Sequence, residues 1–230
     1  MATTADHELD NPVLRSLVGW HNDIAQRDGR AARFHPDVGP FMAVPHDAET
    51  DDWRALARLT RGASGLLFRP AADLPADWKV LHQIEGFQMV GPETRACTAD
   101  DVGVLGPTDV PEMCALAKLT SPGPFSARTV ETGTYLGIKE EGRLVAMAGE
   151  RLHTDHWVEV SAVCTHPDRR GRGYATTLVA ALTSRIRGRG KEPFMHVVGE
   201  NTSALRLYEE LGYEVRRRVQ ATEAVPLRES

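Results

Sequence analysis

Hydrophobic and polar residues follow two periods in the best-defined stretch of the second half of the chain. The run from Trp157 to Thr165 is apolar and β-branched, which predicts a strand, and Pro167 ends it. A helix is predicted next, because apolar side chains recur at helical spacing at Ala175, Leu178, Val179, Leu182 and Ile186. Gly171 and Gly173 lie between the two elements. We therefore predict a strand, a tight glycine-rich turn and a helix in direct succession.

Similar patterns place further elements on both sides of this unit. After residue 92 we expect a strand from Glu93, a helix over 110–120, a hairpin of strands 133–139 and 143–152, a strand over 193–198, a helix from Asn201 ended by Gly212, and a strand over 213–219 before a polar tail. The sequence thus predicts strands and helices that alternate through most of this region.

The first ninety residues predict a smaller set of elements. These are a helix over 11–28 stopped by Gly29, a strand over 41–44, a helix over 51–60, a strand over 65–68, and a strand over 78–90 with a bulge or bend at Gly86. We divide the chain into an α/β unit of unknown function over 1–92 and a second domain over 93–230.

The turn between the strand and the helix has the chemistry of an anion site. Glycine lets a ligand approach the main chain, the first N–H groups of the helix are unpaired, and Arg170 and Arg172 add positive charge. The dinucleotide fingerprint needs a glycine or alanine where Thr176 stands, and the nearest candidate for a Walker loop, at 188–192, fails at both ends. The combination best suits a pyrophosphate.

Two ordered motifs resemble one known family. Arg170-Gly-Arg-Gly-Tyr-Ala175 resembles the coenzyme A pyrophosphate loop of the GCN5-related N-acetyltransferases (GNAT), and the segment from Asn201 to Tyr213 resembles the family's Asn-x-x-Ala-x-x-Leu-Tyr-x-x-Leu-Gly-Phe/Tyr helix. The resemblance covers about 93–219. Gly-Pro-Phe at 123–125, the run at 142–150 and Val-Cys-Thr-His-Pro from Val163 are most similar to the FR47-like branch.

This resemblance implies an α/β (α+β) GNAT fold, with a mixed, mostly antiparallel sheet flanked by helices. The sheet would splay where the strand of Val163 leaves that of His196. The element order of the N-terminal unit loosely repeats that of the second domain, so we interpret it as an α/β extension with a possible origin as a degenerate GNAT-like half. We expect it to pack on the second domain and to wall the acceptor site, without an enzyme activity of its own.

The resemblance also assigns the residues that would bind the cosubstrate, acetyl-CoA. Main-chain groups of the strand would bind pantetheine and the thioester, the loop would bind the pyrophosphate, and an asparagine would lie beside the pantetheine arm. These residues are Val163, Cys164 and Thr165; Arg170, Gly171, Arg172, Gly173, Tyr174, Ala175 and Thr176; and Asn201. By its sequence position alone, Asn201 is a helix N-cap, which is compatible with both roles.

Amide formation from a thioester needs a base for the amine and an acid for the departing thiolate. The resemblance assigns Tyr208 as the acid, although its apolar neighbours would otherwise make it a core aromatic residue. Two residues remain open as the base. Glu159 lies on the central strand and His196 on the next one, and either could instead be a hydrogen-bonded strand residue.

Composition restricts the partners. There are 27 Lys and Arg against 32 Asp and Glu, a net charge of -5, so we expect no nucleic-acid or membrane partner. Three cysteines without ligand-like spacing favour a reducing, cytoplasmic location and no disulfide framework. We expect no metal, since His153 and His156 lack further ligands. Cys164 with His166 as a nucleophile pair is disfavoured against a buried thiol. A homodimer is an open alternative.

The function implied is an acyl-CoA-dependent N-acyltransferase, which transfers acetyl from acetyl-CoA to a primary amine of a small molecule or peptide by direct attack. The segment from Pro122 to Phe125 would lie over the acyl group by resemblance, or be a rigid turn by its prolines alone. A non-catalytic acyl-CoA sensor or an interaction protein is the alternative. Acceptor pockets are built from loops outside these motifs, so the sequence does not identify the amine.

Overall fold

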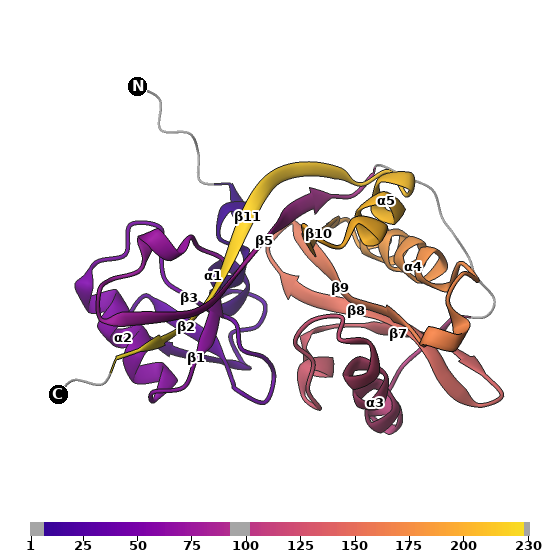
Figure 1. Ribbon diagram of the computed structural model, residues 1–230, viewed down its shortest axis with the longest axis horizontal. Helices are drawn as coiled ribbons and strands as arrows, with labels where there is room; N and C mark the ends of the chain where they lie inside the picture. The colour runs from indigo at the N-terminus through magenta and orange to yellow at the C-terminus, as the bar shows by residue number, and fades with distance from the viewer. Residues whose placement is uncertain (1–6, 93–101, 228–230) are drawn as a thin grey trace.

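The computed structural model describes residues 7–92 and 102–227, and Figure 1 shows its two lobes joined by long strands. In the described residues a large sheet has eight strands in the order β4-β11-β5-β10-β9-β8-β7-β6. Their bounds are β4 Gly65–Leu67, β5 Trp78–Val90, β6 Gly103–Val104, β7 Tyr135–Glu140, β8 Arg143–His153, β9 Trp157–Thr165, β10 Glu192–Val198 and β11 Glu214–Pro226. Only β9 and β10 pair in parallel, so the sheet is mixed and mostly antiparallel, as predicted.

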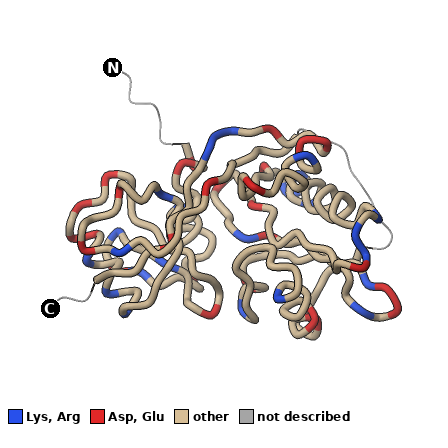
Figure 2. Tube along the Cα trace, viewed as in Figure 1, with Lys and Arg blue, Asp and Glu red and all other residues tan. Residues whose placement is uncertain are grey.

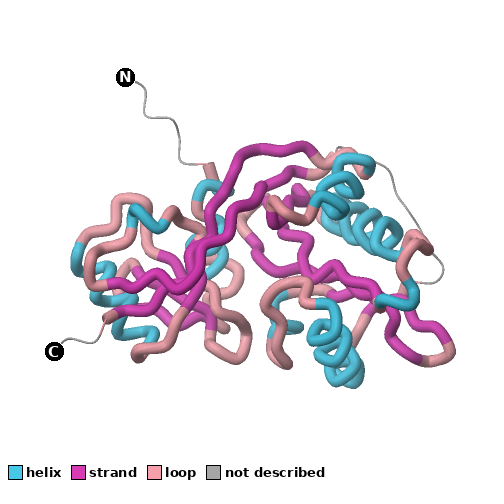
Figure 3. Tube along the Cα trace, viewed as in Figure 1, coloured by secondary structure: helices cyan, strands magenta, loops and turns pink. Residues whose placement is uncertain are grey.

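Helices cover both faces of this sheet in the second lobe, as Figure 3 shows. They are α3 Val110–Thr120, α4 Tyr174–Gly188 and α5 Thr202–Glu210, with short 3-10 turns η3 Pro107–Asp109, η4 Thr129–Thr132 and η5 Pro167–Arg169. Leu178, Val179, Leu182 and Ile186 of α4 pack with Val158 and Val160 of β9 in one core. Met113 and Leu116 of α3 pack on Met147 and Cys164 in another. The helical spacing read from the sequence therefore marks the buried faces.

The first lobe contains a second, three-stranded sheet among the described residues, in the order β1 (Ala25–Asp28), β2 (Ala31–Phe34) and β3 (Met42–Ala43). It is flanked by η1 Glu8–Asp10, α1 Pro12–Val18 and α2 Thr50–Thr60, and η2 Ala71–Asp73 lies in the connection to β5. Leu9, Val13, Leu17 and Phe34 of this lobe share a core with Leu152 of β8 and Phe194 of β10. The first lobe is thus packed directly on the large sheet.

The strands β5 and β11 run through both lobes. They pair antiparallel from Glu214 opposite Val90 to Pro226 opposite Trp78, with β10 on the other side of β5. Figure 1 shows both strands curving from one lobe into the other. The structure does not describe residues 93–101. The strand expected from Glu93 and the expected boundary between the two units therefore lie outside the described residues. The strand β5, which belongs to the unit predicted over 1–92, lies between two strands of the domain predicted over 93–230.

Two details of the predicted elements are wrong, and a third is narrowed. The expected helix over 11–28 ends at Val18, and Ala25–Asp28 is a strand, because Asp28-Gly29 opens a two-residue hairpin turn in which Gly29 has φ +55. The expected polar tail after residue 219 continues β11 to Pro226, since buried Thr222 and Ala224 alternate with more exposed neighbours. At Gly86 a bulge or a bend was predicted; no register shift, and hence no bulge, occurs there, and a Cβ at this position would clash with the Val197 carbonyl oxygen.

Candidate active site

All eleven residues predicted to bind the cosubstrate line one cavity of about 660 Å³, the cofactor cavity. Its wall is formed by the end of β9, the loop from Arg169 to Gly173, and the starts of α4 and α5. Pyrophosphate-sized anions are bound at such helix starts because several main-chain N–H groups point outward there. The structure thus brings the two sequence motifs, which lie 25 or more residues apart, onto a single cavity.

The loop is shaped to receive an anion. Gly171 and Gly173 have φ +76 and +77, and no atom lies within 4 Å of a Cβ built on either, so the loop is open at its glycines. Glu140, the last residue of β7, contacts the loop: it pairs with Arg169 at 2.6 Å and Arg172 at 2.9 Å, and it accepts a hydrogen bond from Tyr174. Within the described residues Arg170 has no ion-pair partner. Its charge is therefore available to a ligand.

The strand β9 is bulged beside this cavity. Three residue steps separate Ser161 from Cys164, whereas their β8 partners Gly149 and Met147 are two steps apart. The extra residue is accommodated at Ala162, which has the unusual value φ +52 for a residue with a side chain. The sequence gives no signal for this bulge, because alanine is not a residue that favours positive φ.

The strands β9 and β10 separate where the bulge begins. Their parallel pairing runs from Trp157 opposite Glu192 to Glu159 opposite Phe194 and stops there. On its β10 side, β9 has no partner strand from residue 160 onward among the described residues. The main-chain groups on that side can therefore bind a ligand. This is the splay that was predicted between the strands of Val163 and His196.

A second cavity of about 280 Å³, the acceptor cavity, lies against the first. The two cavities share Ser121, Pro122, Val163, Asn201, Ala204 and Tyr208. Gly123 and Pro124 line the acceptor cavity, and three aromatic or aliphatic side chains from the first lobe complete it: Phe41, Leu66 and Phe68. Residues of the N-terminal unit and Pro122 to Pro124 thus line one cavity, while Phe125 packs on Tyr135. That this cavity takes the acceptor and the acyl group stays a prediction.

The helix α5 places Asn201 and Tyr208 at the junction of the cavities. The Asn201 side chain caps the helix, since its Oδ1 accepts from the Ala204 N–H at 3.1 Å. Tyr208 is 8% exposed, and burial raises its pKa to about 12. Its phenol is therefore protonated at neutral pH.

A row of polar side chains crosses the sheet on the face toward the first lobe. Arg151 Nε donates to Glu159 Oε2 at 2.8 Å, and Glu159 Oε1 lies 2.7 Å from His196 Nδ1. On the other side, His196 Nε2 lies 3.1 Å from the Gln88 amide nitrogen, and Gln88 Oε1 accepts from Arg216 at 2.8 Å. The row joins β8, β9, β10, β5 and β11. Arg151 and His196 line the acceptor cavity, whereas Glu159 does not.

These contacts determine the proton positions on His196. Arg216 fixes the Gln88 carbonyl oxygen, so the Gln88 amide nitrogen donates to the Leu9 carbonyl oxygen and to His196 Nε2. His196 Nε2 is then an acceptor, and Nδ1–H donates to Glu159. Burial lowers the pKa of His196 below its usual value, against the opposing pull of Glu159. The imidazole is therefore neutral at pH 7.

The electrostatics of Glu159 differ from those of a typical base. Its side chain is fully buried. Burial acts to raise the pKa of Glu159, but Arg151 and then His196 outweigh this effect and lower the pKa to about 2. The carboxylate is thus permanently charged and paired, a poor proton acceptor at neutral pH.

The other candidates have different surroundings. Burial raises the pKa of Cys164 to about 11, so its thiol stays protonated, and the His166 ring accepts from the Asp168 N–H. His156 pairs with Glu8, while His153 stacks on Trp20. Within residues 7–92 and 102–227, no three His, Cys, Asp or Glu side chains gather as metal ligands would.

No helix of the described chain is long and apolar enough to cross a membrane. Figure 2 shows charges of both signs along both lobes.

Comparison with known proteins identifies the class of this fold and site. The FR47-like protein family model matches residues 135–222. The structure of a GNAT-family protein from Novosphingobium aromaticivorans DSM 12444 is 36% identical and superimposes with a TM-score of 0.88, covering 97% of this chain and 100% of that one. The chain belongs to the GNAT superfamily and contains an FR47-like domain.

More distant structures share the fold alone. A GCN5-related N-acetyltransferase from Kribbella flavida is 16% identical, with a TM-score of 0.58 over 93% of this chain and 95% of that one. A GCN5-related N-acetyltransferase-like protein from Streptococcus suis 89/1591 is 20% identical, with a TM-score of 0.54 over 86% and 84%. No curated protein matches this sequence.

Proposed function

We propose that this protein is an acyl-CoA-dependent N-acyltransferase that transfers acetyl from acetyl-CoA to a primary amine by direct attack. The observation that supports this most is the junction of the two cavities at Val163, Asn201 and Tyr208. A thioester in the cofactor cavity and an amine in the acceptor cavity would meet there. Membership of the GNAT superfamily supports the same chemistry.

The residues of the cofactor cavity fit acetyl-CoA, which supplies the acetyl group as a thioester. The open loop at Gly171 and Gly173, the start of α4 and the free Arg170 would hold its pyrophosphate. The unpaired edge of β9 at Val163 to Thr165 would bind the pantetheine arm and the carbonyl oxygen through main-chain groups.

His196 is the best-placed base. Among the described residues that line the acceptor cavity, it is the side chain whose neutral form at pH 7 carries a basic nitrogen lone pair, which in this structure accepts a hydrogen bond from Gln88. His196 Nε2 would exchange the hydrogen bond from Gln88 for one from the amine or from an intervening water. Glu159 then stabilises the imidazolium that forms, so we assign it as the partner of the base. Tyr208 would protonate the departing thiolate.

The first lobe would complete the acceptor site in this proposal. Phe41, Leu66 and Phe68 close one side of the acceptor cavity, and the Phe68 ring stacks on His196 with centroids 4.2 Å apart. Residues 1–92 would thus be a companion unit rather than a second enzyme. Descent of this unit from a second GNAT copy stays a prediction.

Thiol release from acetyl-CoA on a panel of amines tests the function. We expect turnover on at least one amine, and in Tyr208→Phe a kcat about tenfold to a hundredfold lower with an unchanged acetyl-CoA Kd, because the acid is lost and the cavity is kept. Calorimetry with acetyl-CoA measures the Kd. Tight binding without turnover on any amine would instead favour the alternative, a non-catalytic acyl-CoA sensor.

A further inference from the structure

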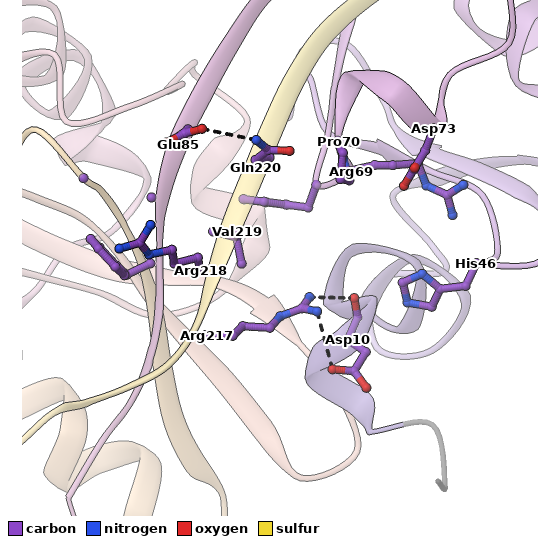
Figure 4. Close-up of a pocket in the computed structure, with 14 residues that line it drawn as sticks. Asp10, His46, Arg69, Pro70, Asp73, Glu85, Arg217, Arg218, Val219 and Gln220 are labelled. Carbon is purple, nitrogen blue, oxygen red and sulfur yellow. Dashed lines mark hydrogen bonds and ion pairs between the residues drawn. The ribbon is translucent and has the colours of Figure 1, made fainter. Parts of the chain in front are cut away.

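A third cavity, of about 680 Å³, lies on the far side of the acceptor cavity from the cofactor site, and we name it the distal cavity. It shares Phe68, Gly86 and Val219 with the acceptor cavity. The three cavities therefore follow one another, with the candidate base His196 in the middle one. Figure 4 shows the distal cavity between β5, β11 and the segments of the first lobe.

Arg69 contributes a positive charge to the distal cavity that is poorly neutralised. Its side chain is half-buried, its Nη2 donates to the Pro45 carbonyl oxygen at 2.7 Å, and its guanidinium lies over the Trp53 ring at 5.5 Å. In the described part of the chain it forms no ion pair within 4 Å, although Asp73 lies near enough to act on it electrostatically. Arg69 directly follows Phe68, which separates the distal cavity from the acceptor cavity.

Arg217 contributes a second positive charge, which is only partly neutralised. It donates to the Asp10 main-chain carbonyl oxygen at 2.9 Å and lies 3.6 Å from Asp10 Oδ1. That same oxygen is already paired with Arg216 at 2.7 Å, so two guanidinium groups share one carboxylate. The Arg217 Nε is buried without a hydrogen-bond partner. Figure 4 shows Arg217 directed toward Asp10 and Arg218 on the other side of β11.

The acidic side chains of the distal cavity lie in different surroundings. Asp73 and Glu85 are exposed, and Glu85 accepts a hydrogen bond from Gln220 at 3.2 Å. Asp10, the third acidic residue of the lining, is half-buried like the arginines, but Arg216 and Arg217 share its carboxylate. Arg69 and Arg217 therefore outnumber Asp10 among the half-buried charges of the lining, and water screens the exposed charges more strongly. A group bound in the distal cavity would therefore bind most tightly if it carried a negative charge.

We infer that the distal cavity binds an anionic group, a carboxylate or a phosphate, at the end of the acceptor opposite its amine. The inference rests on the proposed function, and it defines the acceptor class as small primary amines with an anionic group several bonds from the nitrogen. Arg69 and Arg217 pair with the anion, and the chain of the acceptor passes Phe68 to place its amine beside His196. Arginine suits this task because its planar fork matches both anions.

Matched amines test the inference by thiol release from acetyl-CoA. We compare 4-aminobutyrate with 4-aminobutanamide, and phosphoethanolamine with ethanolamine, so that each pair differs in the anionic group. The wild-type protein should show a kcat/KM about tenfold or more higher for the anionic member of at least one pair, because charged hydrogen bonds are the stronger ones. Which pair shows the difference distinguishes carboxylate from phosphate.

Arg69→Gln removes the charge and keeps a polar side chain. This variant should raise KM for the anionic amine about tenfold and leave KM for its neutral partner and the acetyl-CoA Kd unchanged. Arg185→Gln is the matched control, since Arg185 is exposed on α4 and lines none of the three cavities. Thermal unfolding of both variants confirms that they fold.

The outcomes separate the inference from the proposed function. Turnover with equal or lower kcat/KM for the anionic amines overturns the inference and leaves the acyltransferase standing. If no amine is turned over, calorimetry with 4-aminobutyrate and with phosphoethanolamine in the presence of CoA decides: binding of either one that weakens in Arg69→Gln but not in Arg185→Gln supports the distal site, and equal or absent binding of both overturns it.

Discussion

The cofactor cavity and the acceptor cavity are adjacent but are built in different ways. The cofactor cavity takes most of its wall from two short continuous segments, 163–165 and 169–176. The acceptor cavity takes its wall from six or more separate segments, from Phe41 in the first lobe to Ala221 on β11. Binding of an anion by main-chain groups and a helix start is a local property, whereas a shaped pocket for an amine requires distant segments to meet. Sequence motifs therefore find the first and miss the second.

The largest effect should come from separating the lobes. A fragment over 93–230 lacks β5, which pairs with β11 on one side and β10 on the other. We expect it not to fold, because the middle of the sheet would be open and the core around Phe194 exposed. Circular dichroism and solubility measure this. Co-expression with residues 1–92 should restore a folded complex; a soluble, folded fragment on its own would show that the lobes are independent.

The next effect concerns the cofactor cavity alone. Arg170→Glu combined with Gly173→Glu should weaken acetyl-CoA binding by about a hundredfold or more, because two carboxylates then face the anion and residue 173 needs φ +77. Calorimetry gives the Kd, and the unfolding temperature reports the fold. Gly188→Glu is the control at the other end of the same helix, where a Cβ meets no atom within 4 Å, and its Kd should stay that of the wild type.

The third effect concerns His196, the proposed base in the acceptor cavity. His196→Gln should lower kcat by about a hundredfold and leave acetyl-CoA binding unchanged. The base must be neutral, so wild-type kcat/KM should fall as pH drops through the pKa of His196, which burial places below its usual value of 6.5. That acidic limb should be absent in the variant. His82→Gln, an exposed histidine on β5, should keep it; a limb that persists in His196→Gln would remove His196 as the base.

The smallest effect should come from the side chains that the first lobe contributes to the acceptor cavity. Phe68→Leu removes the ring that stacks on His196 and should raise KM for the amine about threefold to tenfold, with no change in acetyl-CoA Kd. Steady-state kinetics on the best amine measures it. Leu81→Ala, at an exposed position on β5, is the control. Equal KM values for Phe68→Leu and the wild type would mean that the first lobe does not contact the acceptor.

The correct and incorrect predictions have separate physical causes. The order of the elements from 110 to 212 follows from periodicity, which is set by the core that each element buries. The hairpin at Asp28-Gly29 was taken for the end of a helix because glycine is common in both places. The bulge at Ala162 was missed because no residue type there indicates a positive φ, and Ala162 is buried in a core with residues of α3 and β8 that lie far from it in the chain.

The sequence by itself determined the strand–turn–helix unit at 157–188, the helix from Asn201, and the residues around the cofactor cavity. Those features depend on hydrogen bonds and backbone angles within a few residues of each other. Only the tertiary structure decided that β5 lies between β10 and β11, that Glu159 is buried against Arg151 and His196, and that Arg69 and Arg217 share a cavity. These depend on contacts between residues far apart in the chain, whose energies are set by burial and by charges that the local sequence does not contain.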